Sequence, residues 1–255
     1  MNQPSYPFAR SARISLLLVC CTLLGLAGTD LVLPAIPQLP DELGGSVTLA
    51  QMVLAAFTGG TCIGLILYGE LGACFDHGKL LLVSMLAYAA LSLVAALSFS
   101  LEVLVFVRFF QGMAASCAAV IAPGMIRKIF SEQHAVRALG ILGSVESLAP
   151  AIAPIIGVLL LSLGGWQLSF ELTGILALLL AFFVWKINSQ MPTMHMTTVK
   201  TELHQLHLGY VKLLKNTNYL TQALSHAALI GGLLVFVFGS PVVMVITMNG
   251  EISDF

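Results

Sequence analysis

The sequence predicts an all-α polytopic membrane protein, because charges are scarce and charge-free segments are long. Lys, Arg, Asp and Glu make up only 9% of the 255 residues, and the mean hydropathy is +0.97. An ordinary soluble domain is about 25% charged, so this chain lacks the polar residues for a hydrated surface. A helix needs about 20 apolar residues to cross the bilayer. The charge-free segments 43–69, 80–101, 147–170 and 216–250 each satisfy this length.

Seven helices are expected to cross the membrane, and the charges of their connections alternate. The expected spans are 11–34, 47–69, 80–97, 103–125, 139–163, 168–186 and 221–248. Ten of the 11 Lys and Arg residues lie in the N-terminal segment, in the connections after the second, fourth and sixth helices, or at the helix ends that border these segments. The other connections carry none. The positive-inside rule therefore predicts a multi-pass protein of the inner (plasma) membrane with a cytoplasmic N-terminus.

The order of the spans predicts three parts. A six-helix unit, a cytoplasmic linker and the start of a further unit with the seventh helix are expected at residues 1–187, 188–218 and 219–255. Apolar residues of the linker recur at spacings of three and four, namely Val199, Leu203, Leu206, Tyr210 and Leu213. This pattern is typical of an amphipathic helix that lies on the membrane surface.

Three ionisable residues are expected well inside membrane helices, where an isolated charge is costly. Asp30 in the first helix and Arg108 in the fourth both lie ~9 Å below the outer interface. We expect them to form a charge pair, either as a structural salt bridge or as a pair that responds to protons or substrate. Glu146 in the fifth helix has no evident partner, and burial favours its protonated form. It is a candidate proton carrier or, alternatively, a permanently protonated hydrogen-bonding residue.

Two prolines are expected to bend the fifth helix close to Glu146. Pro150 and Pro154 each remove a backbone donor from the helix. A bend beside a buried carboxyl group is typical of a helix that moves or lines a cavity.

The same residues form recognisable motifs. Arg108, Gln111 and Gly112 lie in the sequence R-F-F-Q-G-M-A-A, and Pro154 and Gly157 lie in A-P-I-I-G. The first resembles the R-x-x-Q-G motif of the major facilitator superfamily, in the expected fourth helix. The second resembles the G-P-x-x-G motif of its antiporters, in the fifth. Together they resemble the N-terminal half, plus one helix, of a twelve-span drug:proton antiporter.

Two further segments extend the resemblance. The stretch from Asp30 to Pro37, which includes Pro34, is similar to the Asp-to-Pro end of the first helix in this family. Residues 69–79 fall where the family has a cytoplasmic gating loop of the pattern G-x-L-x-D-R-x-G-R-R, but Ala73 and Cys74 stand in place of its Asp and Arg. The loop residues that we expect to take part in gating are Gly69, Asp76 and Lys79.

The resemblance implies a transporter and not an enzyme, with proton-coupled efflux of small amphipathic compounds or drugs as its activity. The candidates for proton coupling or for lining the cavity are Asp30, Arg108, Gln111 and Glu146. Expected partners are the lipid bilayer, a small-molecule substrate, protons, and either a missing C-terminal half or a second copy of the chain. No cofactor, metal or nucleic acid is expected, because the six histidines are scattered, no CxxC pair occurs and the net charge is −1.

Two alternatives stay open at this point. In the first alternative to a transporter, the chain is an inactive or scaffold-like truncated transporter fragment. In the second, it is a seven-span membrane protein outside this superfamily. The first follows because such transporters work by moving two six-helix halves against each other. The second is disfavoured by the charge pattern, since seven-helix receptors and seven-span sugar channels place the N-terminus outside.

Overall fold

The computed structural model describes residues 7–191, 209 and 212–243, and all long elements in this part of the chain are helices. They are α1 (Phe8–Asp30), η1 (Leu33–Ala35), α2 (Leu39–Leu43), α3 (Val47–Cys74), α4 (His77–Ala96), α5 (Leu101–Ile129), α6 (Glu132–Gly164), α7 (Gln167–Ile187), η2 (Asn188–Gln190) and α9 (Thr217–Val242). Seven of the described helices are long and apolar enough to cross a membrane, and each coincides with an expected span. The predicted all-α polytopic fold is therefore confirmed.

Several helix ends differ from the expected ones for identifiable reasons. α6 begins at Glu132 and not at 139. Its first two turns are helical, but they are too polar for hydropathy to identify them as part of a membrane span. α1 ends at Asp30 and not at 34, and Pro34 instead lies in the short η1 helix, which begins at Leu33. A proline at that position removes a backbone donor and clashes with the preceding turn.

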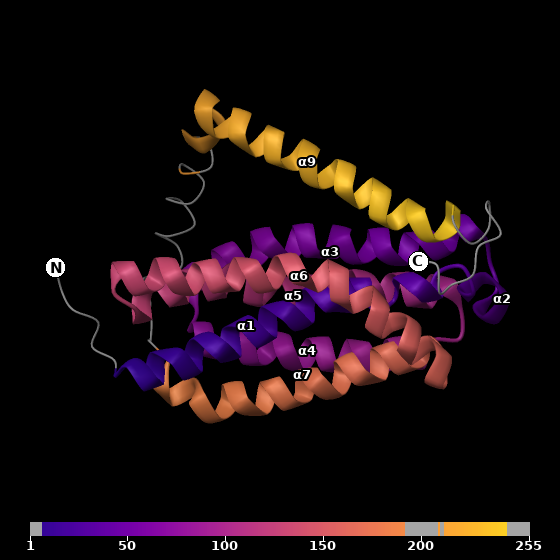
Figure 1. Cartoon of the computed structure of the whole chain (residues 1–255), viewed down its shortest axis with the longest axis horizontal. Helices are drawn as coiled ribbons and strands as arrows, with labels where there is room; N and C mark the ends of the chain where they lie inside the picture. Colours follow the sequence, from indigo (N-terminus) through magenta and orange to yellow (C-terminus); the bar gives the residue numbers. More distant parts are fainter. Residues whose placement is uncertain (1–6, 192–208, 210–211, 244–255) are drawn as a thin grey trace.

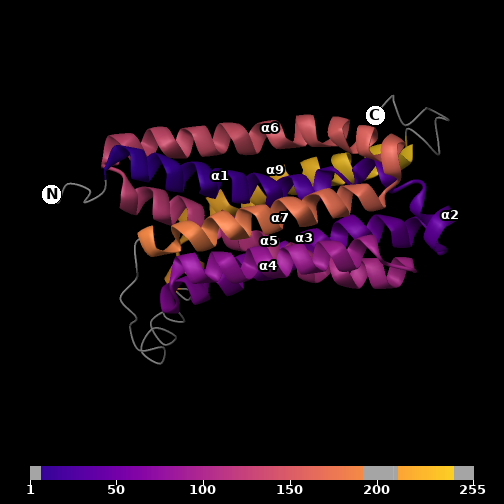
Figure 2. The same ribbon diagram turned by 90° about the horizontal axis from the view of Figure 1, so that it is seen from below.

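The first six long helices form an elongated bundle (Figures 1 and 2). α3 packs along α5, α4 packs along both α7 and α5, and α1 contacts α5, α6 and α7. The α3–α5 contact is close because Gly60 and Gly112 carry no side chain there. A Cβ at Gly112 would overlap the Phe57 carbonyl oxygen, and one at Gly60 would overlap that of Phe109. Small residues that let helix backbones approach are typical of membrane bundles.

The buried core divides along the length of the bundle. One cluster, with Leu18, Met85 and Met125 at its centre, lies toward the end where α1 begins. A second cluster, with Ile36 and Trp166, lies at the opposite end, where η1 and α2 fold over the bundle. That end is also joined by a polar contact, since the Trp166 indole Nε1 donates to Glu42 Oε2 at 2.8 Å.

α9 lies along one side of the bundle and is separated from it over most of its length (Figure 1). Its contacts are near its C-terminal end, where it meets η1 and where Val237 and Phe238 pack against the second core cluster. The amphipathic helix expected in the linker falls almost wholly outside the described residues. The three-part division of the chain stays a prediction.

Candidate functional site

A buried arginine lies where three helices meet. Arg108 on α5 is 0% exposed. Its Nε donates to the Val53 carbonyl oxygen of α3 at 3.4 Å, and its Nη1 donates to the Gly28 carbonyl oxygen of α1 at 3.0 Å. Burying a guanidinium is costly unless its donors are paired, so these backbone carbonyls offset part of its desolvation.

Gln111, one turn further along α5, extends this network to α4. Its Oε1 accepts from Arg108 Nη1 at 2.9 Å, and its Nε2 donates to Ser92 Oγ at 2.7 Å. Ser92 Oγ in turn donates to the Tyr88 carbonyl oxygen at 2.8 Å. The carboxamide of Gln111 therefore has a defined orientation and connects Arg108 to α4.

Two aromatic rings enclose the guanidinium. The Arg108 Cζ lies 4.1 Å from the centroid of the Phe57 ring and 5.6 Å from that of the Phe170 ring. A cation over an aromatic face is stabilised by the quadrupole of the ring. Phe57 and Phe170 are themselves buried, so they also separate the guanidinium from lipid.

Two buried polar atoms lie in this region: Arg108 Nη2, which has no hydrogen-bond partner within the described residues, and Tyr88 Oη, which lies near the hydroxyl groups of Thr173 and Ser92. The two side chains are close enough to interact electrostatically. Gly28 permits this arrangement, because a Cβ there would overlap the Tyr88 hydroxyl. An unpaired buried donor costs about 1–3 kcal/mol, so an acceptor group that reached Arg108 Nη2 would be stabilised.

Asp30, the last residue of α1, interacts electrostatically with Arg108. Its side chain is half-buried. No ion pair joins the two within the part of the chain that the structure describes, because the hydrogen bonds of Arg108 go to Gly28, Val53 and Gln111. The expected direct charge pair is therefore not formed in this structure.

The proline-containing segment of α6 packs against the end of α1. Gly157 lies against the Leu31 backbone, and a Cβ at Gly157 would overlap the Leu31 carbonyl oxygen. α6 continues as one helix through Pro150 and Pro154. Figure 1 shows that it changes direction along its length, as expected for a helix with two interior prolines. The motif glycine therefore positions α6 next to the turn that follows Asp30.

Glu146 lies elsewhere on α6 and does not join the Arg108 network. It stands eleven residues before Gly157, or ~16 Å along the helix axis. Its side chain is half-buried. No hydrogen bond or ion pair of Glu146 is found among the described residues. The role of Glu146 as a candidate proton carrier stays a prediction.

The gating-loop candidates lie at the end of the bundle where α1 begins. Asp76 is the N-cap of α4, and its carboxylate accepts a hydrogen bond from the Lys79 backbone N–H at 3.1 Å. The ring Nε2 of His77 is 3.0 Å from the Gly72 carbonyl oxygen. Gly69 and the Lys79 side chain are exposed. Asp76 thus has a local capping role here, and these residues are far along the bundle from Arg108.

The sequence did not point to several members of the Arg108 network. Tyr88, Ser92 and Phe57 are separated from Arg108 in sequence, and hydroxyl and aromatic side chains are ordinary in membrane helices. The only signal was the occurrence of Tyr88 and Ser92 one turn apart on the same face of their helix. No group of three His, Cys, Asp or Glu side chains that could hold a metal occurs among the described residues.

These features define a class of protein: a polytopic helical membrane protein with a buried, partly unpaired cation at the junction of its helices. The sequence model of the Major Facilitator Superfamily matches residues 18–254. The chain belongs to this superfamily and is a multi-pass protein of the inner membrane. The alternative of a seven-span protein outside the superfamily is therefore wrong.

Sequence similarity to individual proteins also points to the Major Facilitator Superfamily. The chain is 29% identical over 239 residues to the uncharacterized MFS-type transporter YdgK of Bacillus subtilis, covering 90% of this chain and 58% of that protein. It is 26% identical over 220 residues to the chloramphenicol resistance protein CraA of Acinetobacter baumannii, covering 86% of this chain and 52% of that protein. The chain thus spans about half the length of the curated relatives that it matches.

The fold also resembles a solved transporter. The crystal structure of a bacterial homologue of the human lysosomal transporter Spinster, in an inward-facing and unoccupied conformation, superposes with a TM-score of 0.63 at 16% identity. The match covers 76% of this chain and 46% of that one. At this identity the likeness is one of fold.

Proposed function

We propose that the chain forms the first part of a proton-coupled efflux transporter for small amphipathic compounds. The observation that carries this proposal is the unpaired Nη2 of the fully buried Arg108, next to the half-buried Asp30. The name of the relative CraA supports a drug such as chloramphenicol as the substrate class.

In this proposal Asp30 exchanges a proton as its contact with Arg108 changes. When Asp30 is ionised, its carboxylate is attracted to the unpaired Nη2 of Arg108. Proton uptake by Asp30 from the outer side removes this attraction. The end of α1 then shifts relative to α5, and Asp30 releases the proton on the cytoplasmic side when the next substrate molecule binds there, so that protons move inward as substrate is carried outward. The side chain of Asp30 needs to move for this, and its position at the end of α1 permits that movement.

Glu146 is the second proton-carrying candidate of this proposal. Its half-buried side chain lacks a partner among the described residues, and Pro150 lies one turn further along α6. A change in the bend of α6 would change the access of water to Glu146. A carboxyl group binds or loses a proton as its hydration changes.

One exposed face of α6 carries small residues against which a second helical bundle could pack. Gly140, Gly143, Ser144 and Ser147 are exposed on it, and no atom lies within 4 Å of a Cβ built at Gly140 or at Gly143. Small residues at a helix surface let a second helix approach closely. We propose that either a C-terminal half or a second copy of the chain packs here, with the N-terminus in the cytoplasm as the distribution of Lys and Arg predicts.

The test is chloramphenicol accumulation in a bacterial strain without its own drug pumps. Cells that express the chain, alone or together with a six-helix C-terminal half of a relative, should accumulate less drug. A protonophore should abolish the difference. Asp30→Asn should also abolish it, whereas Asp41→Asn, which changes an exposed acid of α2, should leave it intact.

The outcomes separate this proposal from the scaffold alternative. If accumulation is unchanged both with and without the added half, the chain does not transport chloramphenicol and the scaffold interpretation gains support. If efflux persists in the presence of the protonophore, the proton-coupling part of the proposal is wrong.

A further inference from the structure

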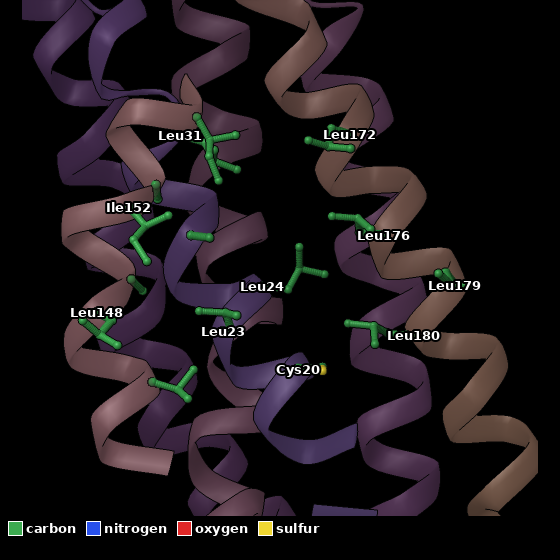
Figure 3. Close-up of a pocket in the computed structure, with 15 residues that line it drawn as sticks. Cys20, Leu23, Leu24, Leu31, Leu148, Ile152, Leu172, Leu176, Leu179 and Leu180 are labelled. Atoms are coloured by element: carbon green, nitrogen blue, oxygen red, sulfur yellow. The ribbon is translucent and has the colours of Figure 1, made fainter. Parts of the chain in front are cut away.

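An elongated cavity lies between α1, α6 and α7, as the close-up in Figure 3 shows. Its volume is about 470 Å³. Every lining side chain is apolar, and the Cys20 thiol is its only heteroatom-bearing group; α9 contributes no lining residue. The cavity does not include Asp30, Arg108 or Glu146, so it is separate from the candidate functional site.

The length of the cavity corresponds to one leaflet of a bilayer. Along α1 its lining runs from Cys20 to Leu31, and along α6 it runs from Val145 to Ile156. Each stretch rises ~16 Å at 1.5 Å per residue. The hydrocarbon core of a bilayer is about 30 Å thick, so the cavity extends over about half of it. The half concerned is the one next to η1, because Leu31 lies two residues before that element.

The cavity opens between α6 and α7 toward the surroundings of the bundle. Its rim includes Leu148, Ile152 and Leu179, which are 56%, 51% and 50% exposed. Its floor includes Ala149 and Ala153, which are buried. α1, α6 and α7 all qualify as membrane spans, so this opening lies at the depth of the lipid hydrocarbon.

We propose that this cavity binds one acyl chain of a phospholipid from the leaflet next to η1. Water or the polar part of a drug would find no hydrogen-bond partner in it, which is costly in an apolar environment. An alkyl chain requires no such partner. The small side chains of Ala27, Ala149 and Ala153 leave the room that the chain occupies. The bound chain would fill the space between α6 and α7 and support α6, the least buried of the first six spans.

Photo-crosslinking in liposomes tests the proposal on the full chain. The probe is phosphatidylglycerol with a diazirine at the end of one acyl chain, and mass spectrometry maps its adducts. We expect adducts at the deep end of the cavity, at Cys20 and Leu180. The same lipid with its diazirine next to the ester should instead label Leu31 and Leu172. This order follows because the headgroup must lie at the η1 end.

Variants that fill the cavity provide the control. Ala27→Leu and Ala153→Leu should each lower the cavity adducts by at least half, and Ala90→Leu on the exposed face of α4 should leave them unchanged. Size-exclusion chromatography and circular dichroism check that each variant is folded. If a leucine variant does not fold, the smaller Ala27→Val or Ala153→Val replaces it.

Three results would overturn the proposal. Labelling of the exposed Leu86 on α4 as strong as that of the cavity, with no effect of the filling variants, would mean ordinary lipid around the bundle. A reversed order of labelling by the two probes would mean a lipid from the opposite leaflet. An absence of cavity adducts with both probes, in protein shown to be folded, would mean that no acyl chain enters the cavity. None of these measurements requires transport.

Discussion

Gly28 accepts a hydrogen bond from Arg108, with its carbonyl oxygen 3.0 Å from Nη1. The same glycine lets the Tyr88 hydroxyl lie against α1, because it has no side chain. The carbonyl group of Gly28 therefore connects α1 to α5 by a hydrogen bond. The absence of a side chain at Gly28 lets α4 approach α1 closely at Tyr88. The last turn of α1, which ends at Asp30, is positioned by both contacts.

The first prediction compares the two charged residues of this site. Arg108→Gln should lower the free energy of unfolding by at least ~1–3 kcal/mol, because carbonyl oxygens of Gly28 and Val53 would lose their buried donor. Asp30→Asn should cost clearly less, since no hydrogen bond of Arg108 depends on it. Thermal unfolding in detergent measures both. Equal losses, with a double variant no worse than either single one, would instead indicate a direct ion pair.

The second prediction concerns the contact between α3 and α5. Gly112→Ala should destabilise the bundle by ~1–3 kcal/mol, because the new methyl group meets the Phe57 carbonyl oxygen and the backbones must separate. Gly59→Ala on the facing helix is the matched control, since nothing lies within 4 Å of a Cβ there. It should be neutral or gain about 0.5–1 kcal/mol from the better helix propensity of Ala. Similar melting temperatures for the two variants would contradict the close approach.

The third prediction concerns the end of the bundle that carries the gating-loop candidates. Gly78 on α4 lies against the Asn188 side chain of η2, and a Cβ at Gly78 would overlap Asn188 Oδ1. Gly78→Ala should therefore displace η2 and speed hydrogen exchange at Met191, whose N–H donates to the Asn188 carbonyl oxygen at 3.1 Å. Gly124→Ala, at a position with open space around it, should leave this exchange rate unchanged. Unaltered exchange in Gly78→Ala would show that η2 is held by other contacts.

The fourth prediction concerns proton coupling. Glu146→Gln should leave the melting temperature within error of the parent protein, because no hydrogen bond or ion pair of Glu146 is found among the described residues. In proteoliposomes that also contain a C-terminal half, it should lose substrate-induced proton release. Glu132→Gln, an exposed acid in the first turn of the same helix, should retain it. Normal release by Glu146→Gln would assign proton coupling to Asp30 or to the added half.

Hydropathy was sufficient to predict the seven spans, because crossing a bilayer imposes a length and an apolar composition on each helix. It could not predict where the helices end beyond the hydrocarbon. The start of α6 at Glu132 depends on polar turns that continue the backbone hydrogen bonding. The end of α1 at Asp30 depends on the backbone chemistry of Pro34, which hydropathy does not report.

The candidate site was predicted only in part. Arg108 and Gln111 stand out in sequence because a cation and a carboxamide are rare inside membrane spans. The partner of Arg108 was not predictable, because a matched depth cannot distinguish the Asp30 carboxylate from the Gly28 carbonyl two residues earlier. The hydrogen bond between Gln111 and Ser92 depends on how α4 and α5 are aligned along their axes. This alignment cannot be read from the sequence of either helix alone.

The sparse contact of α9 with the bundle has a consequence for biosynthesis. Within the described chain, α9 meets the other helices through η1 and through Val237 and Phe238 near its end. The first six helices therefore gain little from α9, and their packing can be complete while α9 is still being made on the ribosome. An error in the docking of α9 would therefore leave the packing around Arg108 intact, because α9 makes few contacts with those helices in the described part of the chain.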